Sequence, residues 1–179
     1  MKYDRLSSKI VFENPYWKYK YDKYELPRGG QGEYHYVDSA GSTMVIPQIS
    51  DDKYILCRQY RYLNSKASIE FPGGGQKLGI TPLENAVDEL REETGYTADS
   101  LELIGENNPF NGVTNEICKV YFASGLTFAG TAPDESEEFE ILELTSDEIN
   151  DMIKTNEIWD GMTIAAWSMY YFSKLNYRK

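Results

Sequence analysis

EFPGGGQKLGITPLENAVDELREETGY, residues 70–96, is the stretch that decides the fold. Its second half carries the signals of a helix start: Thr81 as N-cap, Pro82 at the first helical position and Glu84 closing a capping box. Gly95 supplies the residue at which a helix commonly ends. The sequence therefore predicts a glycine-rich turn followed directly by a helix.

The residues of this predicted helix divide into two neighbouring faces. Apolar side chains at spacings of three and four define an inward face: Leu83, Ala86, Val87 and Leu90. An adjacent stripe holds three glutamates: Glu89, Glu92 and Glu93. Like charges so placed repel one another, and neighbouring cations, solvent or bound metal relieve the repulsion. Because Mg²⁺ and Mn²⁺ prefer oxygen ligands and often join carboxylates to phosphates, the stripe indicates a metal-phosphate site.

The glycine turn suits the same chemistry. Gly73, Gly74 and Gly75 allow the backbone to approach a ligand closely. A carbonyl in such a turn can join the metal shell, and we assign this role to Gly73.

This segment resembles the Nudix box, whose pattern is G-x5-E-x7-R-E-U-x-E-E-x-G-U, where U is a bulky apolar residue. Seven positions match the pattern: Gly74, Glu89, Leu90, Glu92, Glu93, Gly95 and Tyr96. Ile80 replaces the first box glutamate and Asp88 replaces the box arginine, two residues that in the family help hold the loop and helix together. The resemblance implies an α/β fold, the Nudix α/β/α sandwich with a mixed central sheet, here preceded by an N-terminal β arm.

Composition narrows the choice of partners. The chain of 179 residues suits one domain of moderate size, and 41% hydrophobic residues supply a sizeable core. A net charge of −11 argues against nucleic acid and anionic membranes, which clustered Lys and Arg would normally meet. Cys57 and Cys118 lie in apolar runs and are expected to be buried reduced thiols, and the lone His35 cannot build a histidine metal cluster. With no membrane-spanning run and no signal-peptide core, we expect a cytoplasmic protein.

The first forty or so residues are predicted to form an appendage of strands. Residues 9–13, 16–26 and 33–37 read as strands, with a turn over 27–32. They are too short and too aromatic to fold alone, so we expect residues 1–42 to pack on the catalytic domain, residues 43–179, or on a second subunit. The ADP-ribose pyrophosphatase branch of the Nudix family has a comparable arm that contributes to a homodimer, which the resemblance implies here.

A predicted hairpin, 43–49 and 54–60, delivers two arginines to the acidic site. Arg58 and Arg61 are suited to bind phosphate oxygens. For Arg58, the alternative of an ordinary surface arginine fits the sequence equally well. Arg61 matches a substrate-contacting arginine of the resembling branch. Glu70 matches a glutamate common ahead of the box.

Two loops are predicted to serve the site. Residues 105–116 form a loop in which Asn111 stands where the ADP-ribose branch has a proline, with Pro109 two residues earlier. Residues 133–139 hold four carboxylates, and such a charge run is ordinarily a solvated loop. By resemblance, Glu135 would be the base and Glu137 a metal ligand, with Glu138 possible if the loop is shifted by one residue.

Two helices are expected to close the chain, one after the capping signal of residues 145–148 and one from about Gly161. Trp159 and Trp167 are assigned no chemistry. The resemblance implies Mg²⁺- or Mn²⁺-assisted hydrolysis of a nucleoside diphosphate linked to another moiety, such as ADP-ribose or a nucleotide sugar, with two or three ions. The alternative is a catalytically silent Nudix domain that binds a nucleotide as a sensor or regulator. A purely structural module ranks third, because it has no use for such an array of acids.

Overall fold

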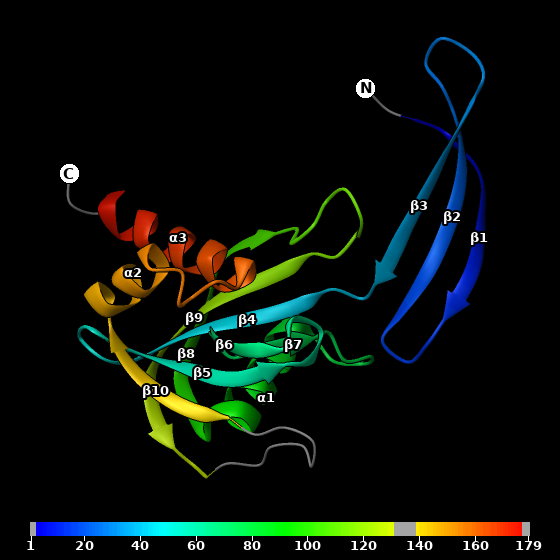
Figure 1. Ribbon diagram of the computed structural model, residues 1–179. Coiled ribbons are helices and arrows are strands. Elements are labelled where there is room, and N and C mark those ends of the chain that lie inside the picture. The colour runs from blue at the N-terminus through cyan, green and yellow to red at the C-terminus, as the bar shows by residue number, and fades with distance from the viewer. Residues whose placement is uncertain (1–2, 131–138, 177–179) are drawn as a thin grey trace.

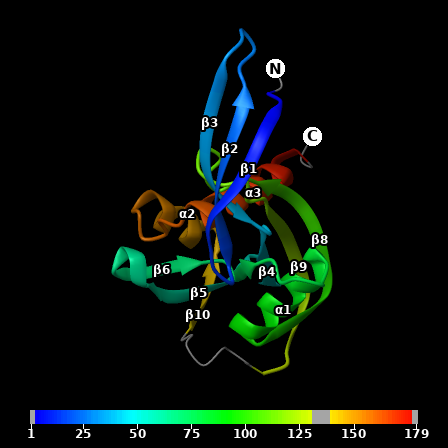
Figure 2. The same ribbon diagram turned by 90° about the vertical axis from the view of Figure 1, so that its right-hand side faces the viewer.

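The structure, a computed structural model, describes residues 3–130 and 139–176. It consists of a body, built around a twisted sheet with helices on both faces, and an arm of three strands beside it (Figure 1). The side-on view shows the arm rising away from the helices and sheet of the body (Figure 2).

The arm is an antiparallel sheet in the order β1-β2-β3: Arg5–Glu13, Trp17–Glu25 and Gln31–Ser39. Gly29 and Gly30 have φ angles of 85° and 95° in the turn between β2 and β3, a region that favours glycine. The three predicted strands are therefore confirmed, and β1 begins four residues before its predicted start. Every residue of β1 is exposed, so the arm buries no core of its own on that strand.

The body sheet runs β10-β5-β4-β9-β8, and the short strands β6 and β7 pair with β5 and β4. Their bounds are Ser42–Ser50 for β4, Lys53–Arg61 for β5, Lys66–Glu70 for β6, Gly73–Gly75 for β7, Tyr96–Asn107 for β8, Cys118–Phe128 for β9 and Glu140–Thr145 for β10. A 3-10 turn, η1, covers Tyr62–Asn64. The pairing of β4 with β9 is parallel and its other neighbours are antiparallel, which confirms the mixed sheet.

Helices cover both faces of this sheet, as the sandwich requires. Helix α1, Pro82–Thr94, lies on one face, and α2, Ser146–Lys154, and α3, Gly161–Asn176, lie on the other (Figure 1). Strand β4 serves both layers because its side chains alternate. Met44 and Ile46 join the core under α2 and α3, whereas Val45 joins the core under α1.

Both cysteines are free and buried, as predicted. Burial raises the pKa of the Cys57 thiol well above its ordinary value and that of Cys118 to about 11. Both thiols therefore act as packing groups of the core. Among the described residues, no helix combines the length and apolar character needed to cross a membrane.

Candidate active site

Helix α1 begins and ends where its sequence signals predict. The Thr81 hydroxyl accepts a hydrogen bond from the Glu84 backbone N–H at 3.2 Å, and the Glu84 carboxylate accepts one from the Thr81 N–H at 2.7 Å. Gly95 has a φ of 78° and donates its N–H to the Arg91 carbonyl at 2.9 Å. These caps fix the helix against the glycine turn that precedes it.

The buried face of α1 is rotated relative to the predicted one. The buried residues are Asn85, Ala86, Glu89, Leu90, Glu93 and Thr94. Leu83 and Val87 are 46% and 40% exposed, so their assignment to the inward face was wrong. Residues one position apart differ by about 100° around a helix, and two overlapping faces share the same spacing of three and four. The helix turns its carboxylates toward β7, so Glu89 and Glu93 are only 8% and 7% exposed.

The glycines of β7 make room for these two glutamates. The Gly73 N–H donates to the Glu93 carboxylate at 3.1 Å. A Cβ atom on Gly74 would lie 2.7 Å from the Glu89 carboxylate, whereas one on Gly75 would meet nothing within 4 Å. Gly73 is confined by its strand partner, since a Cβ there would lie 2.3 Å from the Thr43 carbonyl oxygen. The structure therefore brings Gly73, Gly74, Glu89 and Glu93 together.

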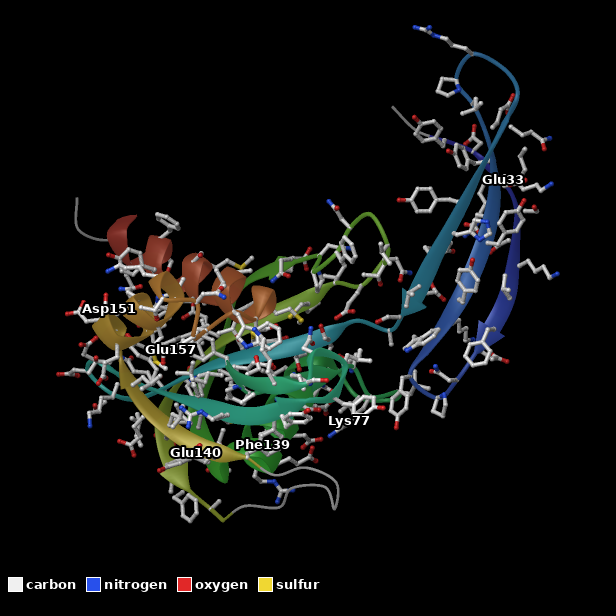
Figure 3. All side chains as sticks on the ribbon, in the orientation of Figure 1. Glu33, Lys77, Phe139, Glu140, Asp151 and Glu157 are labelled. Carbon is white, nitrogen blue, oxygen red and sulfur yellow. The ribbon has the colours of Figure 1, made fainter. Side chains whose placement is uncertain are left out.

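Glu92 stands at the rim of this cluster, where it meets Lys77. The Lys77 ammonium lies 2.8 Å from the Glu92 carboxylate and 3.5 Å from that of Glu89, and Figure 3 labels this lysine. Burial lowers the pKa of Lys77, but the hydrogen bond to Glu92 and the charges of Glu89 and Glu92 outweigh it and raise the pKa above 10.5. Sequence reasoning missed Lys77, although a cation in the glycine turn before an acidic helix was a visible signal.

Asn85 is a second residue that sequence reasoning missed. Its side chain is fully buried, and its amide oxygen accepts the Lys77 backbone N–H at 2.9 Å. The amide nitrogen donates to the Thr43 hydroxyl at 2.8 Å. Nearby, the Gln76 amide donates to the carbonyls of Lys77 and Ile80. In this chain, which lacks the box glutamate and arginine, Asn85 and Gln76 join the loop to α1 and β4.

The two predicted phosphate-binding arginines are both paired with carboxylates. The Arg61 guanidinium makes a two-pronged contact with Glu70, and its Nε–H donates at 2.8 Å. The hydrogen bond to Glu70 is the main cause that raises the Arg61 pKa. Arg58 lies 2.8 Å from the carboxylate of Glu140, which β10 places opposite it (Figure 3).

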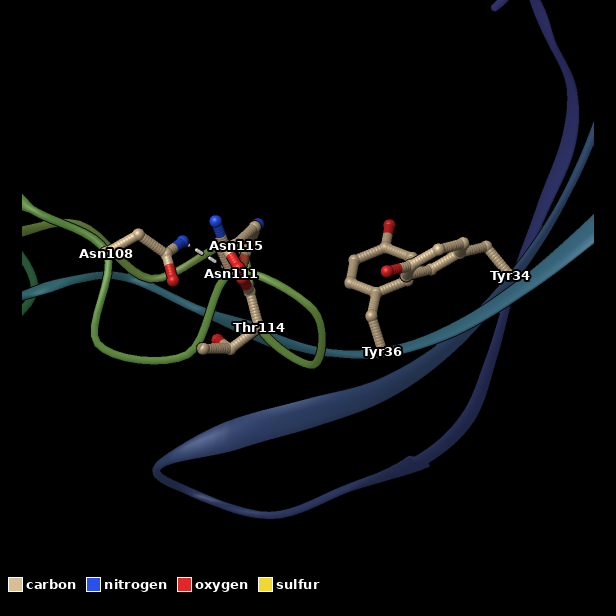
Figure 4. Close-up of a pocket in the computed structure, with 6 residues that line it drawn as sticks. All are labelled: Tyr34, Tyr36, Asn108, Asn111, Thr114 and Asn115. Carbon is tan, nitrogen blue, oxygen red and sulfur yellow. Dashed lines mark hydrogen bonds between the residues drawn. The ribbon is translucent and has the colours of Figure 1, made fainter.

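Asn111 lies apart from the glutamates, in a pocket between the arm and the body. The pocket has a volume of about 340 Å³ and is lined by Tyr34, Tyr36, Asn108, Asn111, Thr114 and Asn115. Figure 4 shows the two tyrosines of β3 facing the polar loop residues. Strand β8 extends to Asn107, so the predicted loop begins later than expected, at residue 108.

Glu135, Glu137 and Glu138 lie outside the described residues. Within 3–130 and 139–176, no three His, Cys, Asp or Glu side chains are grouped closely enough to hold a metal ion together. The donors that are described nevertheless suit a hard cation, because they are the oxygens of two buried carboxylates and of a glycine carbonyl beside them. Glu89, Glu93 and the Gly73 carbonyl are the groups that fit it.

Comparison with known proteins identifies the family of this chain. The family model of the NUDIX domain matches residues 40–165. The chain belongs to the NUDIX family. The matched range contains β4 to β10, α1, α2 and the first five residues of α3, and it leaves the arm outside.

Two relatives extend the similarity. A methanol dehydrogenase activator of Bacillus methanolicus is 32% identical over 163 residues, covering 90% of this chain and 88% of that protein. An ADP-ribose pyrophosphatase of Bacillus subtilis (strain 168) is 31% identical over 144 residues, covering 79% and 78%. A crystal structure of an ADP compounds hydrolase has a TM-score of 0.86, covers 99% of this chain and 97% of its own, and shares 19% identity, which shows the fold. The chain is a Nudix pyrophosphohydrolase resembling the ADP-ribose pyrophosphatases.

Proposed function

We propose that this Nudix protein hydrolyses the diphosphate bond of a nucleoside diphosphate linked to another moiety, with ADP-ribose or a nucleotide sugar as substrate. For ADP-ribose the products are AMP and ribose 5-phosphate. The observation that carries this proposal is the burial of Glu89 and Glu93 on the inner face of α1. Carboxylate oxygens are the ligands that Mg²⁺ and Mn²⁺ prefer, and two of them gathered at a glycine turn support a cation site there.

The proposed cofactor is a set of two to three Mg²⁺ or Mn²⁺ ions. Glu89, Glu93 and the Gly73 carbonyl would hold these ions, together with Glu92 at the rim and Glu137 from the acidic loop. When bound, such ions neutralise diphosphate charge and lower the pKa of water. The Gly73 N–H orients Glu93 for this task at 3.1 Å. Glu135, or Glu138 in a shifted register, would take the proton of the attacking water.

Arg61 and Glu70 would hold the substrate as a pair. Glu70 is 4% exposed and Arg61 is about half exposed, so the pair presents the guanidinium outward. A phosphate that contacts Arg61 shares it with Glu70, which fixes the direction of the guanidinium. Arg58 and Asn111 are the more distant members of the proposed substrate site.

A second candidate function is regulation through nucleotide binding without appreciable turnover. The similarity to a methanol dehydrogenase activator over 90% of this chain supports the regulatory part of this candidate. Ile80 and Asp88 in the box point the same way, because the loop loses its family ion pair.

The cytoplasmic location stays a prediction.

We further propose that residues 1–42 form a dimerisation arm for the catalytic domain of residues 43–179. The arm presents exposed apolar side chains on β1, including Ile10, Val11 and Phe12. Its hydrogen bonds to the 108–117 connection involve Gly112, Val113 and Asn115: Tyr34 donates to the Gly112 carbonyl, the Val37 N–H donates to the Val113 carbonyl at 2.8 Å, and Asn115 pairs with Val37, Asp38 and Ser39. Light scattering on the full chain tests this, and a monomer at micromolar concentration contradicts it.

The activity test is incubation with Mg²⁺ and a panel of ADP-ribose, nucleotide sugars, NADH and dinucleoside polyphosphates. Release of two monophosphate products from one of them supports the hydrolase. Calorimetric binding of a nucleotide without product supports the regulator. If the protein neither binds nor hydrolyses any compound of the panel, both functions are contradicted.

A further inference from the structure

Lys77 places a positive charge inside the site proposed for divalent metal. Its ammonium is 2.8 Å from Glu92 and 3.5 Å from Glu89. We propose that Lys77 is the built-in counter-ion of the glutamate cluster, that divalent metal displaces it, and that it thereby sets the affinity of the site for metal. This inference rests on the proposed function, because it requires metal at the same glutamates.

The turn that carries Lys77 is held in place by hydrogen bonds. The Lys77 N–H donates to Asn85, which is buried, and Gln76 donates its own N–H to the Gly41 carbonyl at 2.9 Å. The backbone is therefore fixed, and the side chain, which is 43% exposed, is free to leave the carboxylates for solvent. A fixed backbone with a movable ammonium is what reversible displacement requires.

Charge balance explains why the two cations compete. Without metal, the Lys77 ammonium offsets the repulsion between neighbouring glutamates on α1. Mg²⁺ and Mn²⁺ bind oxygen at distances well below those of an ion pair, so a metal at Glu89 and an ammonium at the same oxygens exclude each other. Metal binding then has to break the contact between Lys77 and Glu89, which weakens the apparent affinity.

The test is a Mn²⁺ titration of wild-type protein, K77M, K77R and a control variant, K154M. Lys154 lies 2.7 Å from Asp151 on α2, so K154M removes a paired ammonium with the same change in net charge. We expect K77M to bind Mn²⁺ about three- to tenfold more tightly than wild type, as loss of a partly exposed pair allows. K77R and K154M should stay within about twofold of wild type.

Thermal unfolding supplies the second measurement. In EDTA, K77M should unfold at a lower temperature than wild type, because the glutamates lose their counter-ion. In saturating Mn²⁺ this difference should disappear or reverse. If the role of Lys77 were merely structural, K77M would instead bind metal more weakly than wild type and would be less stable both in EDTA and in Mn²⁺.

The outcomes separate the two proposals. If wild type binds Mn²⁺ and K77M binds it with equal or lower affinity, the inference about Lys77 is wrong and the metal site stands. If wild type binds no Mn²⁺, the metal site itself is contradicted and the role of Lys77 fails with it.

Discussion

Helices α1 and α2 start in the same way and end up with different tasks. Each begins with a threonine whose hydroxyl accepts the backbone N–H of a glutamate three residues on, and that glutamate returns the bond. Yet α1 buries two glutamates, an asparagine and a threonine, whereas the buried residue of α2 is Ile149. The same capping box therefore begins a helix with buried polar groups, where we propose the metal site, and a helix whose buried residue is apolar.

The largest expected effect is on the buried carboxylate of Glu93. Glu93→Gln removes the charge but keeps an oxygen that can accept the Gly73 N–H, so the fold should survive. We expect turnover to fall at least about a hundredfold, equivalent to about 2.7 kcal/mol in the barrier. The matched change in α2 is Asp151→Asn, a 72% exposed carboxylate that should leave turnover within about twofold. Steady-state kinetics compare the turnover of the two variants, and equal unfolding midpoints show that both are folded. Equal losses of turnover in Glu93→Gln and Asp151→Asn would contradict a special role for α1.

The second effect is on stability and concerns Asn85. Asn85→Ala leaves the Thr43 hydroxyl and the Lys77 N–H without their buried partner, which should lower the free energy of unfolding by about 2–3 kcal/mol. Asn150 of α2 accepts the Trp167 indole N–H at 2.9 Å in a half-buried setting. Asn150→Ala should cost only about 1 kcal/mol. Urea unfolding measures both, and a larger loss for Asn150→Ala would place the tighter polar contact in α2.

The third effect uses two glycines one residue apart. Gly74→Ala puts a methyl group 2.7 Å from the Glu89 carboxylate and should displace it, lowering turnover about tenfold. Gly75→Ala adds the same methyl group to open space and should change turnover less than twofold. If both variants keep full activity, Glu89 is not needed where the structure places it.

The smallest effect should be shared by the two helices. Hydrogen bonds from Thr81 and Thr145 lower the pKa values of Glu84 and Glu148 below 4.5. A lowered folded pKa means that the stabilisation is present above about pH 4.5 and is lost as the pH falls through the folded value. Glu84→Gln and Glu148→Gln should each lower the unfolding temperature by no more than about 2 °C at pH 7, and the loss should shrink at pH 3. Scans at both pH values test whether the caps are equivalent.

Local chemistry made much of this fold predictable. Thr81, Pro82 and Gly95 set the ends of α1 through contacts with residues close in sequence, so their assignment needed no knowledge of the sheet. The spacing within the box likewise identified Glu89 and Glu93 without knowledge of the sheet. The parallel pairing of β4 with β9 joins residues about 75 positions apart, and the resemblance implied only that the sheet is mixed.

Contacts across the fold account for what was missed. Leu83 and Val87 satisfy the helical spacing, but the sheet and β7 decide which of two overlapping faces is covered. Arg61 and Glu70 were each identified, while their contact depends on the geometry of β5 and β6. Lys77 was visible in the sequence as a cation in the glycine turn, but its contact with Glu92 depends on the position of that turn relative to α1. Glu135 and Glu137 remain predictions.

Strand β4 limits how this chain can vary in length. Its side chains point alternately into the two cores, and its backbone pairs with β5, β7 and β9. Inserting one residue there would exchange the sides of Val45 and Ile46 and shift the glycine turn against its partner. The 108–117 connection between β8 and β9, in contrast, can lengthen without moving a glutamate of α1. A longer connection would instead disturb Asn111 and the hydrogen bonds that Gly112 and Val113 accept from β3.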